Sequence, residues 1–184
     1  MDSLVPAFVA ALLAGLSDRP AWRAAIDADA RGSLGAVVVA TVLAQALVGA
    51  AAALGGSLIA ATLAPNARAL LLGLALLCAG VGGLWPVKPP KPSAGGVAAL
   101  VVTVIAGCFS DRAAFVTFAL AARGPSPVLA GVGGAAGGIV VTVIAASLGA
   151  LAWRRVARPG VALACNAALI LVGAVAALSA LRLI

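Results

Sequence analysis

The sequence contains no histidine, no tyrosine and no glutamate. Histidine and glutamate are common zinc ligands, and with tyrosine they supply many of the general acids and bases of enzymes. Their absence argues against an enzyme, and we expect no tightly bound cofactor. Cysteine is also scarce. Cys78, Cys108 and Cys165 lie far apart within apolar runs, where we expect small packing residues and no metal cluster.

Charged residues make up only 9% of the 184 residues, whereas 64% are hydrophobic. So little polar surface cannot cover a soluble globule. The apolar runs divide into six segments, each about as long as the 20 residues that cross a hydrocarbon core of about 30 Å. The composition therefore predicts an all-α integral membrane protein with six transmembrane helices and no room for a soluble domain.

We place the six helices at about 4–30, 34–54, 67–84, 96–122, 128–152 and 160–181. Pro20 predicts a kink or short unwinding over 16–20, because proline removes a backbone donor and clashes with the preceding turn. The glycine pair at 55–56 loosens the chain before 57–63, which either extends the second helix or forms a short piece at the interface. The fourth helix carries Asp111 near its centre.

The fifth helix is dense in glycine. Gly133 and Gly137 are four residues apart, and so are Gly134 and Gly138. Small residues at this spacing let helix backbones approach closely in a membrane. We therefore expect tight packing against this helix.

A proline-rich segment, 86–94, lies at the midpoint of the chain and contains four prolines and two lysines. The pattern before it, 1–85, repeats after it in 95–184 with an offset of 92 to 93 residues. Each half has three predicted crossings, an odd number, so the second half must lie upside down relative to the first. The sequence thus predicts two inverted three-helix repeats, a construction that many secondary transporters share.

The triplet Ser17-Asp18-Arg19 lies inside the first predicted helix, and Ser110-Asp111-Arg112 lies inside the fourth. A charge at mid-membrane costs roughly 2.5 to 3.5 kcal/mol even on the mildest scale, so it marks a functional site by default. These six residues are the predicted site for transport and ion binding, and Asp18 and Asp111 are its candidate metal ligands. As residues that line the pathway we add Thr41, Gln45, Thr142 and Asn166.

At these triplets the chain resembles uncharacterised protein family 0016, the Golgi calcium/manganese:proton exchangers and bacterial manganese exporters. That family carries Glu-x-Gly-Asp-(Lys/Arg)-(Thr/Ser) in the first helix of each half. The corresponding segments here are 15–20 and 108–113, with Gly15 and Cys108 where the family has glutamate. The resemblance implies a six-helix exchanger of a cation, Mn²⁺ or Ca²⁺, against protons, with Asp18 and Asp111 in the ion site. The missing glutamates weaken a divalent site, because such ions prefer several charged oxygen ligands.

Two hypotheses follow. In the first, Asp18 and Asp111 bind a small cation or a proton in turn at the interface between the repeats. Burial favours the neutral form of a carboxyl group and a nearby arginine opposes this, and the sequence leaves open which effect prevails. In the second, Asp18 pairs with Arg112 and Asp111 with Arg19, as a structural clamp in a scaffold or partner of another membrane protein. Arginine suits such pairs because its fork meets a carboxylate and keeps its charge.

The net charge of +7 does not indicate nucleic acid, because the basic residues are scattered over connecting segments. They fit membrane topology better. Seven of them fall on one side: Arg23, Arg31, Lys88, Lys91, Arg154, Arg155 and Arg158. Three fall on the other: Arg68, Arg123 and Arg182. The positive-inside rule then puts both termini outside, and in a bacterium this multi-pass protein belongs to the inner membrane.

The expected partners are the lipid bilayer, a small cation and protons. The sequence leaves open whether the protein forms a homodimer.

Overall fold

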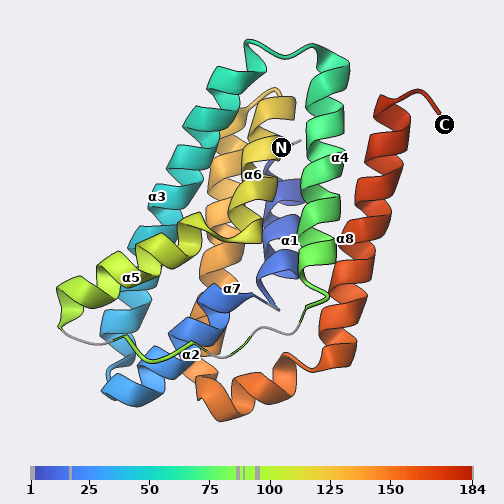
Figure 1. Cartoon of the computed structure of the whole chain (residues 1–184). Helices are drawn as coiled ribbons and strands as arrows, with labels where there is room; N and C mark the ends of the chain where they lie inside the picture. The colour runs from blue at the N-terminus through green and yellow to red at the C-terminus, as the bar shows by residue number, and fades with distance from the viewer. Residues whose placement is uncertain (1–2, 17, 86–87, 89, 94–95, 184) are drawn as a thin grey trace.

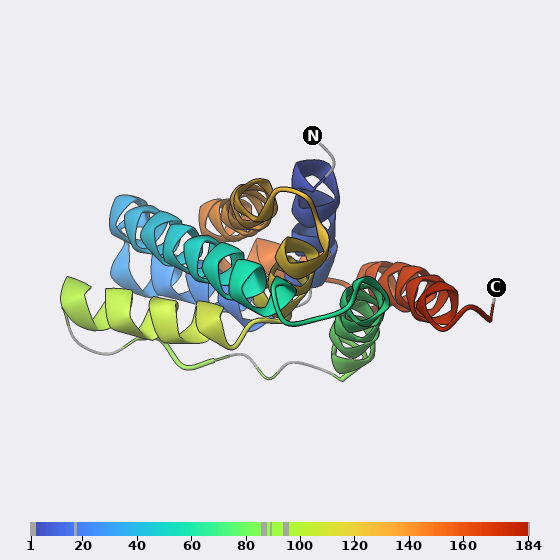
Figure 2. The same ribbon diagram turned by 90° about the horizontal axis from the view of Figure 1, so that it is seen from above.

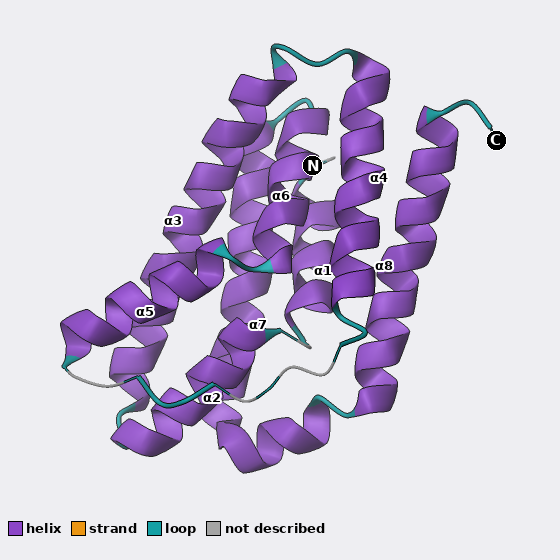
Figure 3. Cartoon of the chain, viewed as in Figure 1, coloured by secondary structure: helices purple, strands orange, loops and turns teal. Residues whose placement is uncertain are grey.

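The computed structural model describes residues 3–16, 18–85, 88, 90–93 and 96–183. Over these ranges the chain forms helices and connections and no strand (Figures 1 and 3). The eight helices of this part of the chain are α1 (Leu4–Gly15), α2 (Arg19–Arg31), α3 (Leu34–Ala60), α4 (Pro65–Gly82), α5 (Val97–Phe109), α6 (Arg112–Arg123), α7 (Pro127–Val156) and α8 (Pro159–Ala180).

The helices are long and apolar enough for a multi-pass membrane protein. Among the described residues, α3, α4, α7 and α8 could each cross a membrane alone. The bent pairs α1–α2 and α5–α6 could each form one further span, which gives four to six spans. The predicted all-α membrane class therefore agrees with the structure at this level.

The predicted break in the first helix is confirmed. The axes of α1 and α2 differ by 64°, so the expected single helix over 4–30 is two helices. Pro20 is the second residue of α2, where its missing N–H group needs no partner. Proline therefore begins the second helix of the pair as well as ending the first.

The helix predicted over 96–122 is also two helices, α5 and α6. The axes of α5 and α6 differ by 56°, and no proline marks this bend. Instead, the Asp111 carboxylate accepts the backbone N–H of Ala113, and the Ser110 hydroxyl donates to the carbonyl of Ala106. Side chains that bond to nearby backbone groups compete with the helical hydrogen bonds and favour a helix boundary.

The second predicted helix also differs in length. It continues through the glycine pair at 55–56 and ends at Ala60, so the extension of the helix and not a separate interfacial piece is observed. Gly56 allows α3 to touch α6, since a Cβ atom here would lie 2.6 Å from the Cβ of Ala121. The two glycines therefore serve packing and do not end the helix.

Corresponding helices of the two halves run in opposite directions (Figure 1). α3 and α7 are antiparallel, and so are α4 and α8. One end of the bundle carries the connections 61–64 and 124–126, and we call it the α3–α4 end; the opposite end carries α2, and we call it the α2 end. Seen from above, α4 and α8 lie side by side at one edge of the molecule (Figure 2). The bends of α1–α2 and α5–α6 lie between the two ends, at the centre of the bundle.

The glycines of α7 allow α1 to approach closely. A Cβ atom on Gly133 would meet the carbonyl of Leu4, and one on Gly137 would lie 2.6 Å from the carbonyl oxygen of Phe8. At both positions the added Cβ atom would lie closer to the α1 backbone than van der Waals contact allows. The predicted close packing at this glycine spacing is therefore present, against the backbone of α1.

The second glycine pair of α7 faces other neighbours. A Cβ atom on Gly134 would meet the side chain of Thr117 on α6, and one on Gly138 would lie 2.6 Å from the carboxamide carbon of Gln45 on α3. One glycine-rich helix thus packs against three others. This packing fixes the helices that surround the bends.

We expect Gly137→Ala to lower the free energy of unfolding by about 1 to 3 kcal/mol, because its Cβ would press on the α1 backbone. Thermal unfolding in detergent, followed by circular dichroism, measures the change. The matched control is Gly35→Ala, where a Cβ meets nothing within 4 Å. Equal melting of the two variants would show that α1 and α7 are not in close contact.

Candidate functional site

Asp18 and Asp111 hold equivalent positions, each directly before the second helix of a bent pair. Asp18 accepts the backbone N–H of Arg19 at 2.7 Å, and Asp111 accepts that of Ala113 at 3.1 Å. A carboxylate here satisfies a donor that the helix leaves free, and its charge interacts favourably with the positive end of the helix dipole. The two bends therefore place both acidic side chains at helix N-termini inside the bundle.

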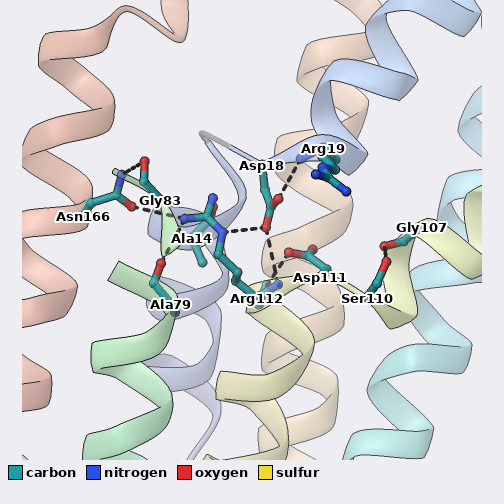
Figure 4. Close-up of polar contacts among 11 residues, drawn as sticks. Ala14, Asp18, Arg19, Ala79, Gly83, Gly107, Ser110, Asp111, Arg112 and Asn166 are labelled. Carbon is teal, nitrogen blue, oxygen red and sulfur yellow. Dashed lines mark hydrogen bonds and ion pairs between the residues drawn. The ribbon is translucent and has the colours of Figure 1, made fainter. Parts of the chain in front are cut away.

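The two carboxyl groups come together at the centre of the bundle (Figure 4). Figure 4 shows them close to each other, and both line the same cavity, although they belong to opposite halves of the sequence. Asp18 is 7% exposed and Asp111 is 8% exposed. The meeting of the two buried carboxyl groups, which both hypotheses require, is therefore observed.

Among the residues that the structure describes, the Arg112 side chain binds four acceptors on different elements. Its Nε atom donates to Asp18 Oδ2 at 2.9 Å, and this contact is also an ion pair. Its Nη1 donates to the carbonyl of Ala79 at 2.9 Å and to Asn166 Oδ1 at 3.5 Å, and its Nη2 donates to the carbonyl of Ala14 at 3.2 Å. The planar guanidinium group thus joins α6 to α1, α4 and α8 and to the cap of α2.

Asn166, which was predicted to line the pathway, instead contacts Arg112 and the end of α4. Its side chain is fully buried, accepts from Arg112 and donates from Nδ2 to the carbonyl of Gly83 at 2.8 Å. It therefore supports Arg112 from α8 and does not line the cavity at the carboxyl pair. The reason is that α8 packs mainly on α4, at the edge of the bundle.

A cavity of about 320 Å³ lies beside the two carboxyl groups. Thr41 of α3, Thr142 of α7 and Ser110 line it together with Asp18 and Asp111, so the structure brings these predicted residues together. The cavity wall thus combines carboxyl and hydroxyl oxygens from both halves. Such oxygens are the ligands that hard cations prefer.

Gln45, by contrast, does not reach this cavity. It lines a separate space of about 10 Å³, beside Thr117 and Gly134. Gln45 lies one helical turn beyond Thr41 on α3, and there its carboxamide packs against Gly138. The prediction that Gln45 lines the same space as Asp18 and Asp111 therefore differs from the structure.

The second predicted ion pair is not formed. Arg19 is exposed and lines the cavity, and among the residues that the structure describes no ion pair joins it to Asp111. The cluster is thus asymmetric, with Arg112 engaged in the bundle and Arg19 directed towards solvent-accessible space. Ser17, the remaining predicted site residue, lies outside the described residues.

The linker contributes to the site, which the sequence did not indicate. Asp27 of α2 is fully buried and accepts the N–H of Ser93 at 2.6 Å and its hydroxyl at 2.8 Å. Arg31 donates to the carbonyl of Ser93 at 2.9 Å. This contact holds the linker on α2, where Pro90 lines the cavity. An aspartate close to a helix end gives no signal by which this partner, far along the chain, could have been found.

The donor set for a metal is small. Within the described ranges no group of three or more cysteine, histidine, aspartate or glutamate side chains could hold a metal ion. Asp18 and Asp111 are the two carboxylates of the site, and Arg112 already occupies one oxygen of Asp18. The remaining ligands would have to be hydroxyl or carbonyl oxygens or water.

We expect Arg112→Gln to lower the free energy of unfolding by about 3 kcal/mol, because it removes the guanidinium group that neutralises a buried carboxylate and donates to the carbonyls of Ala14 and Ala79. Arg19→Gln, at the corresponding position of the other half, should change it by less than about 0.5 kcal/mol, since that side chain is exposed. Unfolding in detergent compares the two. Equal losses would contradict the asymmetry of the cluster.

No protein-family model, no curated protein and no solved structure matches this chain. The geometry of the site is therefore the basis on which its function can be inferred.

Proposed function

We propose that the protein is a secondary membrane transporter that exchanges a small cation for protons at the cavity beside Asp18 and Asp111. One observation carries this proposal: two buried carboxyl groups, one from each half, meet on the wall of a cavity that hydroxyl groups also line. Ionisable groups in a membrane interior are costly and are typical of ion and proton pathways.

In this proposal the halves 1–85 and 95–184 act as inverted three-helix repeats joined by 86–94. Each half has a bent pair, a long helix and a shorter helix in the same order, and corresponding helices run in opposite directions. Six crossings follow if each bent pair crosses once. Transporters of this construction place their sites where interrupted helices from the two repeats meet, which supports the location of the site.

The proton site is the carboxyl pair itself. Two carboxylates that lie close together in a buried site repel each other, which favours a proton on one of them. The closeness of Asp18 and Asp111 supports a loaded state in which the pair holds one proton. A cation that enters the cavity would then displace this proton and bind between the two groups.

The proposed cation is Mn²⁺ or Ca²⁺, on the resemblance to family 0016, which is itself part of the proposal. Asp18, Asp111, Thr41 and Thr142 offer oxygens. A divalent cation needs both negative charges, and Arg112 holds Asp18. We therefore infer that binding of the cation and the pair between Arg112 and Asp18 exclude each other.

This competition couples loading to movement of the halves. Arg112 joins Asp18 to the carbonyls that end α1 and α4, so its release loosens the contact between the halves on that side. Arg19, which lines the cavity, is the corresponding residue of the first half. In the opposite state we propose that Arg19 pairs with Asp111, so that the two arginines alternate as the halves rock.

For orientation we propose that the α2 end faces the cytoplasm. Seven basic residues lie at this end, on α2, in the linker and around the junction of α7 and α8, and three lie at the other end. Both termini are then outside, which in a bacterium is the periplasmic side of the inner membrane. In the described state the cavity opens towards the cytoplasm, because Arg23 of α2 and Pro90 of the linker line it.

The second candidate function is the structural clamp, and the four acceptors of Arg112 favour it. A fully satisfied arginine holds helices together without any transport. A double variant that exchanges the two charges, Asp18→Arg with Arg112→Asp, would be destabilised whichever function is correct. The reason is that the carbonyls of Ala79 and Ala14 would lose the donor that Arg112 provides. A stability measurement on this variant therefore cannot distinguish the clamp from the transporter. The measurement that separates them is flux.

We expect purified protein in vesicles to take up Mn²⁺ or Ca²⁺ when an opposite pH gradient is applied. Asp111→Asn should reduce this flux to that of protein-free vesicles, because the amide cannot hold the exchanged proton. Its oxygen can still accept the N–H of Ala113, so the variant should melt as the parent does. Asp29→Asn, which alters an exposed carboxylate outside the cavity, is the control.

Two outcomes would contradict the transport proposal. The first is a parent protein that moves neither cation under any pH gradient, in which case the clamp remains. The second is an Asp111→Asn variant that transports as fast as the parent.

We expect Ser110→Cys to react with a membrane-impermeant maleimide from the α2 end only, because Ser110 is exposed and lines the cavity. The native cysteines Cys78, Cys108 and Cys165 are replaced by alanine beforehand. Thr62→Cys, in the exposed connection between α3 and α4, should react from the opposite side. Labelling of Ser110→Cys from the side that labels Thr62→Cys would refute the proposed opening of the cavity.

A further inference from the structure

A second recess lies away from the carboxyl pair, on the face where α1 and α6 meet α4 and α8. It has a volume of about 530 Å³, and its walls are apolar side chains such as Val9, Leu76 and Val172. Its polar members are Ser3 and Arg123, at the α3–α4 end. We call this recess the α1–α8 groove.

The groove has the length of one leaflet of a bilayer. On α1 its lining residues extend from Ser3 to Leu13, ten residues apart, which is about 15 Å along a helix. The hydrocarbon core of a bilayer is about 30 Å thick, so the groove reaches from one interface to about the midplane. This is the depth that one lipid acyl chain occupies.

Arg123 lies at the interfacial end of the groove. It is the last residue of α6 and is exposed, and within the described part of the chain it forms no ion pair or hydrogen bond. It also lines a neighbouring recess of about 620 Å³ between α4 and α8, which shares Val172 with the groove. A cation without a partner among the described residues thus lies where the two recesses meet.

The charge at this end is positive. Arg68, Arg123 and Arg182 lie there, while the aspartates that the structure describes lie at the bends or on α2. A ligand that fills the groove therefore needs an apolar chain about one leaflet long and a negative group at its interfacial end. A second copy of this chain would bring its own basic residues to the same end, and a neutral lipid would offer Arg123 no counter-charge.

We propose that the α1–α8 groove is a binding site for an anionic phospholipid, with an acyl chain between α1 and α8 and the phosphate of the headgroup at Arg123. This site is separate from the transport cavity and does not depend on the proposed function. Arginine is well suited to phosphate because its planar fork donates two parallel hydrogen bonds. The lipid would join the edge pair α4–α8 to α1 and α6.

Native mass spectrometry of delipidated protein tests the proposal. The protein is mixed with equal amounts of phosphatidylglycerol and phosphatidylcholine that carry the same acyl chains. We expect the parent to bind phosphatidylglycerol about fivefold more, the effect of one basic residue on an anionic lipid. Arg123→Gln should bring this ratio close to one, whereas Arg68→Gln, which lies at the same end but lines neither recess, should leave it unchanged.

A second variant tests the apolar part of the site. Ala168 is exposed on α8 and lines the groove, so Ala168→Phe should fill it without disturbing the core. We expect this variant to bind less of both lipids while its preference for phosphatidylglycerol stays the same for the lipid that remains. Its melting in detergent should match that of the parent.

Each other outcome overturns the proposal. If the parent binds both lipids equally, Arg123 does not bind the headgroup. If Arg68→Gln and Arg123→Gln lower the preference for phosphatidylglycerol equally, the preference comes from the overall surface charge of this end and not from the groove. Full lipid binding by Ala168→Phe places the lipid elsewhere. A parent that appears as a dimer and retains no lipid would assign the groove to a second copy of the chain.

Discussion

The ion pair between Arg112 and Asp18 is the interaction on which the centre of the structure depends. An arginine in a membrane interior cannot lose its charge, so it must find acceptors or be excluded from the bundle. Arg112 finds them on α1, α4 and α8 as well as on Asp18. The positions of four helices are therefore set by the requirements of one side chain.

The two helix bends make this arrangement possible. Each break leaves N–H groups free at the start of one helix and carbonyl groups free at the end of another. Asp18 and Asp111 accept from the free N–H groups, and Arg112 donates to the carbonyl of Ala14 at the end of α1, as well as to that of Ala79 in the last turn of α4. In lipid such interruptions are tolerated only where protein or water satisfies the backbone. The charged cluster and the broken helices thus stabilise each other, and they lie beside the cavity because neither can face lipid.

The rest of the bundle is packed unevenly around this centre. On one side the glycines of α7 bring α1, α3 and α6 into close contact and leave little room for movement. On the other side α8 packs mainly on α4, and an apolar groove lies where this pair meets α1 and α6. A transporter needs both properties, because rocking of two halves requires rigid units and a contact that can open. In the proposed mechanism Arg112 lies at that contact, and a bound lipid would fill the groove behind it.

The sequence by itself determined the class of the protein, the approximate positions of its apolar helices and the two aspartates of the site. These follow from local composition: apolar length sets the spans, and a lone acid in an apolar run is conspicuous wherever the chain goes. The bend at Pro20 was predictable for the same reason, whereas the bend at Ser110 was not, because it arises from side-chain bonds that compete with the helix. Only the tertiary structure decided that Arg112 is engaged while Arg19 is exposed, and that Asn166 supports Arg112 and does not line the cavity. Both arginines follow a Ser-Asp pair in the sequence, and what decides their roles is which helix ends the fold brings within reach of each guanidinium group.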